Sequence, residues 1–244
     1  MWEFVVVFAI ILLGAIVQGV SGFGLGLVAM GVLPLFLTIK ESTLLVISLL
    51  VVAAVTVVIK NAKHIEWKKV RAILIFALLG RIAAFFILSR YGDLDILKTW
   101  LGIFLILMVG YLLFQSVMKP EKKEPTLWIA IMLGLLGGFI GGLFGVGGPF
   151  FVFYFLMVFA TDKYKYLVNV QFVTLIVCLF SIVLHAINGD FQSSFIGLFI
   201  AGTLAVMIGT FIGLRLFAKV NNEVIRKLAM FLVLISALNL ILFS

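Results

Sequence analysis

Residues 14–24 read GAIVQGVSGFG and residues 137–147 read GGFIGGLFGVG, so glycine stands at the first, sixth, ninth and eleventh place of both stretches. The two stretches lie 123 residues apart in apolar surroundings. Glycine is 23 of the 244 residues, so four coincidences in one short window are improbable by chance. A repeated glycine break inside hydrophobic segments predicts two related halves, each with an interrupted helix. In secondary transporters such breaks often line the substrate site.

Composition places the chain among the polytopic membrane proteins. Hydrophobic residues make up 65% of it and charged residues 11%, and its mean hydropathy is +1.35, whereas soluble domains are about half apolar and about a quarter charged. The single cysteine, Cys178, excludes a disulfide framework. No basic cluster precedes the first apolar stretch, so residues 2–20 are predicted to be a membrane span and not a signal peptide.

The long apolar segments are the candidate membrane helices, long enough or nearly so to cross a hydrocarbon core about 30 Å thick. They cover residues 2–20, 43–59, 72–88, 96–117, 127–144, 167–186, 195–214 and 228–243. Two shorter segments, 27–38 and 150–160, directly follow the glycine stretches. As helices they reach only about 16–18 Å, which is too short for a crossing. We therefore predict two hairpins, 2–38 and 127–160, each with its glycine-rich tip inside the membrane.

The prediction for the whole chain is an all-α polytopic membrane protein built from two inverted repeats. Each repeat holds one glycine-broken hairpin and three further membrane helices. The first repeat covers residues 1–118, the second covers 127–244, and residues 119–126 form a cytoplasmic linker. The correspondence continues beyond the hairpins, where Ser48 falls opposite Gln171.

Loop charges predict the inversion. Loop 60–71 carries five basic residues and one acid, whereas its counterpart 187–194 carries no basic residue. The bias reverses in the next pair, because loop 89–98 is balanced and loop 215–227 carries four basic residues against one acid. Since positively charged loops stay in the cytoplasm, corresponding loops face opposite sides. Both termini are then extracellular, and the two hairpins enter from opposite faces.

Two signatures resemble those of a known family. Residues 18–29, QGVSGFGLGLVA, followed by Pro34 and Leu35, look like the first signature of the TauE/SafE family, also called the toluene sulfonate uptake permease family. Residues 141–149, GGLFGVGGP, followed by Tyr154, look like its second signature. The resemblance covers essentially the whole chain. It implies a transporter of two inverted halves whose substrates are sulfite and organosulfonates, mostly exported.

The glycine tips are candidates for an anion site. Glycines within residues 22–26 can adopt a positive φ and leave backbone N–H groups unpaired. Such groups at the start of a half-helix, together with the positive end of its dipole, attract anions. Two tips from opposite faces could hold one oxyanion near the midplane. The alternative is helix packing, because Gly137, Gly141 and Gly145 form a GxxxGxxxG run.

Arg81 is the most distinctive single residue. It lies ten positions after Arg71, about 15 Å into its span and so near the middle of the membrane. A charge there is a functional hypothesis by default, and guanidinium suits a forked oxyanion. The alternatives are a structural arginine bonded to hairpin carbonyls and an arginine that extends to the membrane surface. The matching position in the other repeat, Thr210, is uncharged.

The remaining polar candidates are weaker. Gln18 precedes the first tip and could donate to an anion or bond to loop backbone, and Asn169 and Gln171 lie near the inner end of their span. His185, near the outer end of that span, is interpreted as a solvated residue more readily than as a proton relay. The predicted substrate-binding residues are Gln18, Ser21, Gly22, Gly24, Arg81, Gly145, Gly147, Gly148, Asn169 and Gln171.

All ten acidic residues fall in loops or at span ends, so no carboxylate relay is predicted at mid-membrane. Export of a monoanion needs none, because an inside-negative potential favours it by about 2.3 kcal/mol per 100 mV. We therefore hypothesise electrogenic anion efflux without obligatory proton coupling. Liposome flux of a sulfonate that ignores an imposed potential would contradict this hypothesis.

The predicted function is export of sulfite or small organosulfonate anions across the cell membrane by alternating access. The alternatives are uptake of sulfate-like or other small anions and a non-transporting membrane scaffold. An enzyme is not expected, because the chain has no HExxH motif, no buried acid dyad and one cysteine without a partner. We expect no cofactor, no metal and no nucleic-acid partner. The expected partners are a small anionic sulfur-containing substrate and the lipid bilayer.

Overall fold

A computed structural model describes residues 2–117, 125–159, 162–192, 195–216, 231, 233–235 and 237–242, and within these ranges it contains no strand. The α-helices are α1 (Trp2–Ser21), α2 (Leu25–Val32), α3 (Ile39–Asn61), α4 (Trp67–Tyr91), α5 (Ile96–Val117), α6 (Leu127–Phe144), α7 (Gly148–Val158), α8 (Lys163–Ile187) and α9 (Phe195–Leu216). Two short 3-10 helices, η1 (Leu33–Leu35) and η2 (Ala62–His64), follow α2 and α3. The described residues between 231 and 242 are also helical.

Five helices among the described residues are long and apolar enough to cross a membrane, namely α3 with η2, α4, α6, α8 and α9. α3 is the most buried of the five, and α9 exposes large apolar side chains such as Met207 and Phe211. A lipid environment tolerates such exposed apolar faces and requires helices that satisfy their own backbone hydrogen bonds. The predicted class, an all-α polytopic membrane protein, is confirmed. The division into two repeats stays a prediction.

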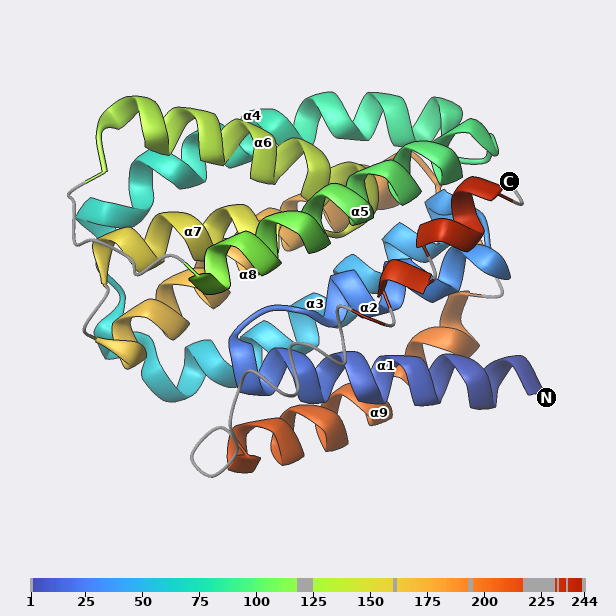
Figure 1. The fold of residues 1–244 in the computed structure, drawn as a ribbon, viewed down its shortest axis with the longest axis horizontal. Helices are drawn as coiled ribbons and strands as arrows, with labels where there is room; N and C mark the ends of the chain where they lie inside the picture. The colour runs from blue at the N-terminus through green and yellow to red at the C-terminus, as the bar shows by residue number, and fades with distance from the viewer. Residues whose placement is uncertain are drawn as a thin grey trace.

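The two hairpins enter the molecule from opposite ends (Figure 1). α1 begins at the right-hand end of the view, beside the N mark, and α6 begins at the left-hand end. Each hairpin reverses at its glycine stretch, so α2 returns to the right and α7 returns to the left. The two breaks therefore approach each other in the interior.

Side-chain caps fix the point where each short hairpin arm turns into a long helix. Thr38 and Glu41 form a capping box at the start of α3: the Thr38 hydroxyl accepts from the Glu41 N–H at 3.2 Å, and the Glu41 carboxylate accepts from the Thr38 N–H at 2.9 Å. Asp162 caps α8 by accepting from the N–H groups of Tyr164 and Lys165. The caps replace the backbone partners that a helix start lacks.

Glycines bring α4 against α6. A Cβ at Gly138 would overlap the carbonyl oxygen of Ala77, and one at Gly134 would lie 2.7 Å from that of Ile73. Within the hairpin, Gly137 and Gly141 pack instead against the start of α7. Packing of small residues is the contact that lipid-embedded helices favour. The packing alternative therefore accounts for the glycines along α6 up to Gly141.

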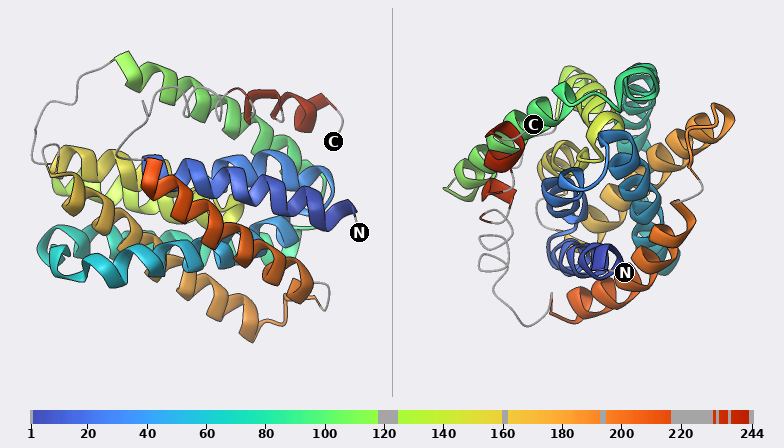
Figure 2. Two further views of the ribbon diagram at one scale, coloured as in Figure 1. Left: turned by 90° about the horizontal axis from the view of Figure 1, so that it is seen from below. Right: turned by 90° about the vertical axis from the view of Figure 1, so that its right-hand side faces the viewer.

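The helix contacts cross between the two predicted repeats. α4 packs along α6, α1 packs along α9, and α3 packs along α8. Gly209 and Gly213 of α9 lie against the backbone of α1, in the way that glycines join α4 and α6. Seen end-on, α5 and the described C-terminal residues lie side by side on one flank (Figure 2), where a Cβ at Gly102 would lie 2.9 Å from the Ala237 carbonyl.

Two sequence predictions fall partly outside the described residues. Of the linker 119–126, only residues 125 and 126 are described, and the last predicted span, 228–243, is described at residues 231, 233–235 and 237–242. The basic loop 215–227 is described only at residues 215 and 216.

Candidate functional site

Both helix breaks are made by glycines with a positive φ. Gly22 has a φ of 83° and Gly24 a φ of 132°, between the end of α1 and the start of α2. Gly145, directly after α6, has a φ of 67°. A side chain strongly disfavours these conformations. In each break one glycine N–H closes the last helical turn, from Gly22 to the Gln18 carbonyl at 2.7 Å and from Gly145 to the Gly141 carbonyl at 3.0 Å.

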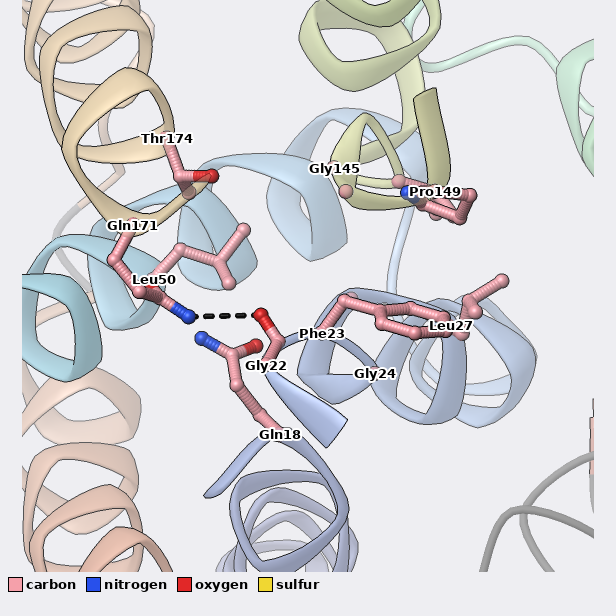
Figure 3. Close-up of a pocket in the computed structure, with 13 residues that line it drawn as sticks. Gln18, Gly22, Phe23, Gly24, Leu27, Leu50, Gly145, Pro149, Gln171 and Thr174 are labelled. Carbon is pink, nitrogen blue, oxygen red and sulfur yellow. Dashed lines mark hydrogen bonds between the residues drawn. The ribbon is translucent and has the colours of Figure 1, made fainter. Parts of the chain in front are cut away.

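The two breaks touch each other. A Cβ at Gly26, in the first turn of α2, would overlap the Gly145 carbonyl oxygen, and one at Gly148, the first residue of α7, would lie 3.2 Å from Cβ of Phe23. Between them lies a small pocket that α3 and α8 complete (Figure 3). It is lined by Gln18, Gly22, Phe23, Gly24, Gly26, Leu27, Leu50, Gly145, Val146, Gly148, Pro149, Gln171 and Thr174.

Two helices begin at this pocket. α2 starts after Gly24 and α7 starts after Gly147, and neither cap glycine has a side chain to accept from the first N–H groups. At the first break the Gln18 amide oxygen takes over part of that role, accepting from the Leu25 N–H at 3.3 Å. The positive ends of two short helix dipoles therefore converge on one small space, which favours a negatively charged ligand.

Two glutamines supply the polar side chains at the first break. Gln18 of α1 and Gln171 of α8 are 5% and 3% exposed and approach each other beside the Gly22 carbonyl (Figure 3). The Gln171 Nε2 donates to that carbonyl at 2.8 Å, and the Gln171 Oε1 is buried without a partner. Thr174, three residues after Gln171, also lines the pocket. The i, i+3 spacing on one helix face was the signal that could have added Thr174 to the prediction.

Arg81 lies outside the pocket, behind the second break. Its side chain is 2% exposed, Nη1 donates to Ser181 Oγ at 3.2 Å, and Nη2 lies 3.8 Å from Cys178 Sγ. A Cβ at Gly141 would lie 2.9 Å from Nη2, so the guanidinium lies close against the end of α6. No carboxylate among the described residues pairs with it. Arg81 is thus a buried cation whose polar neighbours on α8 are a hydroxyl and a thiol.

Asn169 ties a loop to α8. Its Nδ2 donates to the carbonyls of His64 at 3.2 Å and Lys165 at 2.6 Å, and its Oδ1 accepts from the Glu66 N–H at 2.9 Å. Glu66 also pairs with the Lys165 ammonium at 2.6 Å. The Asn169 amide therefore makes its hydrogen bonds within the protein, where it holds the connection between α3 and α4.

The structure brings six of the ten predicted residues together around one pocket. Gln18, Gly22, Gly24, Gly145, Gly148 and Gln171 line it, whereas Gly147, Arg81 and Asn169 do not. Gly147 packs on Gly137 and Gly141 of its own hairpin. Ser21 is the last residue of α1, and its side chain lies outside the described residues.

A second polar cluster joins α4 to the loop after α8. The sequence interpretation of His185 as solvated is wrong, because the ring is 1% exposed and its Nδ1 lies 2.6 Å from the Asp190 carboxylate. Ser89 of α4 donates to the same carboxylate oxygen at 2.6 Å. Burial alone would raise the pKa of Asp190, but hydrogen bonds from Ser89, His185 and Asn188 hold it below its ordinary value. The Asn188-Gly189 turn, with φ of 74° at Gly189, was the sequence signal for this reversal.

The chain matches the sequence profile of the family described as "Sulfite exporter TauE/SafE" over residues 7–240. It belongs to this family. The resemblance seen in the two signatures is confirmed, and the family is one of membrane transporters.

Two curated relatives agree with this membership. A probable membrane transporter protein of Methanocaldococcus jannaschii is 36% identical over 87 residues, which are 35% of this chain and 33% of the relative. The probable sulfite/organosulfonate exporter TauE of Cupriavidus necator is 29% identical over 149 residues, 58% of this chain and 56% of the relative. The alignments thus cover less than two thirds of either relative. No solved structure matches.

Proposed function

We propose that this TauE/SafE transporter exports sulfite or small organosulfonate anions by alternating access around the pocket between the two breaks. The observation that carries the proposal is the meeting of two glycine breaks, from hairpins that enter from opposite ends, at one pocket (Figures 1 and 3). The family description and the name of the Cupriavidus relative support the sulfur oxyanion as ligand.

The pocket suits an oxyanion through backbone groups more than through side-chain charge. α2 and α7 start at it with their positive dipole ends, and glycines at positions 24, 26, 145 and 148 let the backbone approach closely. Phe23, Leu27 and Leu50 supply apolar walls, which lower the local dielectric and strengthen these interactions. Such a site suits a small anion, whether or not the anion carries an apolar group.

Arg81 contributes to this proposal as a fixed positive charge behind the second break. It does not line the pocket, yet it contacts the end of α6, and Gly141 packs in turn on Gly147. Coulomb attraction acts across a layer of backbone when the surroundings have a low dielectric constant. Arg81 therefore positions the second break and contributes a positive electrostatic potential, without needing direct contact with the ligand.

Asn169 has a different role, because it holds the loop between α3 and α4.

Helix packing defines the bodies that would move. α4 is joined to α6 and α9 to α1 by glycine contacts that bring backbones together. Each body therefore combines the hairpin of one predicted repeat with the fourth helix of the other, α1–α2–α9 against α4–α6–α7. We infer that these bodies rock about α3 and α8 and open the pocket to each side in turn.

Loop charge gives the proposed orientation in the membrane, and the membrane potential gives the proposed direction of transport. The basic connection between α3 and α4 lies at the end of the molecule where α5 ends and α6 begins (Figure 1), and we place this end in the cytoplasm of a cell with both termini outside. An inside-negative potential then drives a monoanion outward by about 2.3 kcal/mol per 100 mV.

Reconstituted protein tests the proposal. Liposomes loaded in turn with sulfite, sulfate, thiosulfate, taurine and sulfoacetate should release a sulfur oxyanion faster with the protein than without it. Release of a singly charged substrate should accelerate when an inside-negative potential is imposed. Absence of flux for every anion from folded protein would overturn the transport of these substrates. Flux that ignores the potential would overturn the electrogenic mechanism alone.

A further inference from the structure

The hydrogen-bonding pattern of the pocket defines its ligand more closely than the family does. We propose that the transported anion carries a single negative charge and also a hydrogen-bond donor, an O–H or N–H group. Hydrogen sulfite and hydroxyl-bearing sulfonates have this chemistry, whereas simple alkyl sulfonates lack the donor and sulfate lacks both the single charge and the donor. The inference rests on the proposed function and narrows its substrate class.

The donor is required by an unpaired acceptor. Five buried side-chain polar atoms among the described residues lack a partner, and they belong to Ser42, Arg81, Gln171, Thr203 and Thr210. Gln171 is the one of these residues that lines the pocket. A buried acceptor without a donor is unfavourable, so a ligand that donates to it gains affinity over one that does not.

The orientation of the Gln171 amide follows from its neighbour. The Nε2 donates to the Gly22 carbonyl at 2.8 Å, and reversing the amide would set two oxygen acceptors against each other. The equivalent oxygen of Gln18 is already occupied by the Leu25 N–H. Gln171 Oε1 is therefore left to the ligand, and an oxyanion whose oxygens all lack hydrogen would be repelled by it.

The single charge is required by the neutral lining. None of the described side chains that line the pocket is ionisable. The nearby cation, Arg81, is directed to Ser181 and Cys178 and separated from the pocket by the glycine backbone of α6 and α7. Desolvation of an ion rises with the square of its charge, so helix dipoles and amide donors that hold a monoanion are insufficient for a dianion.

Two sulfonates that differ by one hydroxyl test the donor. Isethionate and ethanesulfonate carry the same permanent single charge, and isethionate adds a terminal O–H. Binding to the purified full chain should be about tenfold tighter for isethionate, the factor expected of one buried hydrogen bond. Equal affinities, or tighter binding of ethanesulfonate, would overturn the inference and leave the proposed function intact. Failure of all sulfur oxyanions to bind would overturn both.

Variants at corresponding positions locate the effect. Gln171→Met removes the acceptor and should abolish the preference for isethionate. Ser48→Ala is the matched control, because Ser48 is the counterpart of Gln171 in the other predicted repeat and its hydroxyl donates to the Leu44 carbonyl of its own helix. The control should keep the tenfold preference. A preference that survives in folded Gln171→Met would exclude Gln171 as the acceptor.

Sulfite tests the charge and the donor together. Lowering the pH converts the dianion to hydrogen sulfite, which has both the single charge and the donor, so sulfite binding should tighten as the pH falls through that titration. Isethionate keeps its charge over the same range, and its affinity should stay constant, which separates ligand protonation from protein protonation. Sulfite binding that weakens or stays constant would overturn the inference that the pocket prefers a singly charged, hydrogen-bearing anion.

Discussion

The two helix breaks share a backbone design and differ in the side chains around them. At the first break, Gln18 caps the new helix and Gln171 holds the Gly22 carbonyl. At the second, no side chain caps α7, and Arg81 lies behind the break against Gly141. In the predicted repeat, the position that matches Arg81 is the uncharged Thr210 of α9. Two stretches with the same glycine spacing thus form two similar helix ends, but amide side chains lie beside the first and a cation lies behind the second.

The largest effect is expected from a side chain in the break itself. Gly24→Ala should destabilise the protein by about 2 kcal/mol or more and abolish anion binding, because φ is 132° and the new Cβ would lie 2.6 Å from Val17 Cγ1. Gly145→Ala should have a smaller effect, since its φ of 67° is an allowed left-handed conformation, although its Cβ would meet Val46 Cγ1 at 2.9 Å. Thermal unfolding and anion titration measure both.

Gly110→Ala is the control for these two variants, because a Cβ at Gly110 has no atom within 4 Å. It should leave unfolding and binding unchanged or slightly improved. If Gly145→Ala were as damaging as Gly24→Ala, the two breaks would be equivalent in their backbone constraint.

Removal of the charge behind the second break should have the next largest effect. Arg81→Gln should weaken anion binding about tenfold, corresponding to roughly 1–2 kcal/mol for a charge acting through a low-dielectric interior. Arg81→Lys should retain most of the affinity, and Thr210→Ala at the matching position should change it little. Dissociation constants from calorimetry would compare the anion affinities of these variants. Identical affinities for the Gln and Lys variants would show that the charge has no part in binding.

The hydrogen bonds of Asn169 to the connection between α3 and α4 should affect stability and leave anion binding nearly unchanged. Asn169→Ala removes three hydrogen bonds, leaves the Glu66 N–H without that partner, and should lower the free energy of unfolding by about 1–3 kcal/mol. Hydrogen exchange should rise in the connection between α3 and α4. Loss of anion binding in a folded Asn169→Ala protein would instead place Asn169 in the site.

The smallest effect is a pH dependence at the opposite end of α8. The pKa of Asp190 is lowered in the folded protein, so its hydrogen bonds stabilise the fold above the unfolded pKa, about 4, and this contribution is lost as the pH falls through the folded pKa. The melting temperature of the wild type should therefore fall more steeply with acidification than that of Asp190→Asn. Parallel curves for the two proteins would contradict this assignment.

Sequence reasoning succeeded where a residue type has one physical use. Glycine at positions 22, 24 and 145 predicts a helix break, because these conformations strongly disfavour a side chain. It failed for His185, whose burial depends on a turn that brings back Asp190. It also grouped Asn169 with Gln171 in one predicted site. The two residues are two positions apart on the same helix, and side chains at that spacing point in different directions.

The sequence by itself determined the membrane class, the family and the position of the glycine breaks, because hydropathy and glycine content act locally along the chain. Only the tertiary structure decided that Gln18 and Gln171 meet at Gly22 while Arg81 faces Ser181. It also decided that α4 packs with α6 and α1 with α9. These contacts join residues up to about 200 positions apart, as between Gly19 and Gly213, and side-chain direction at such separations depends on how helices pack.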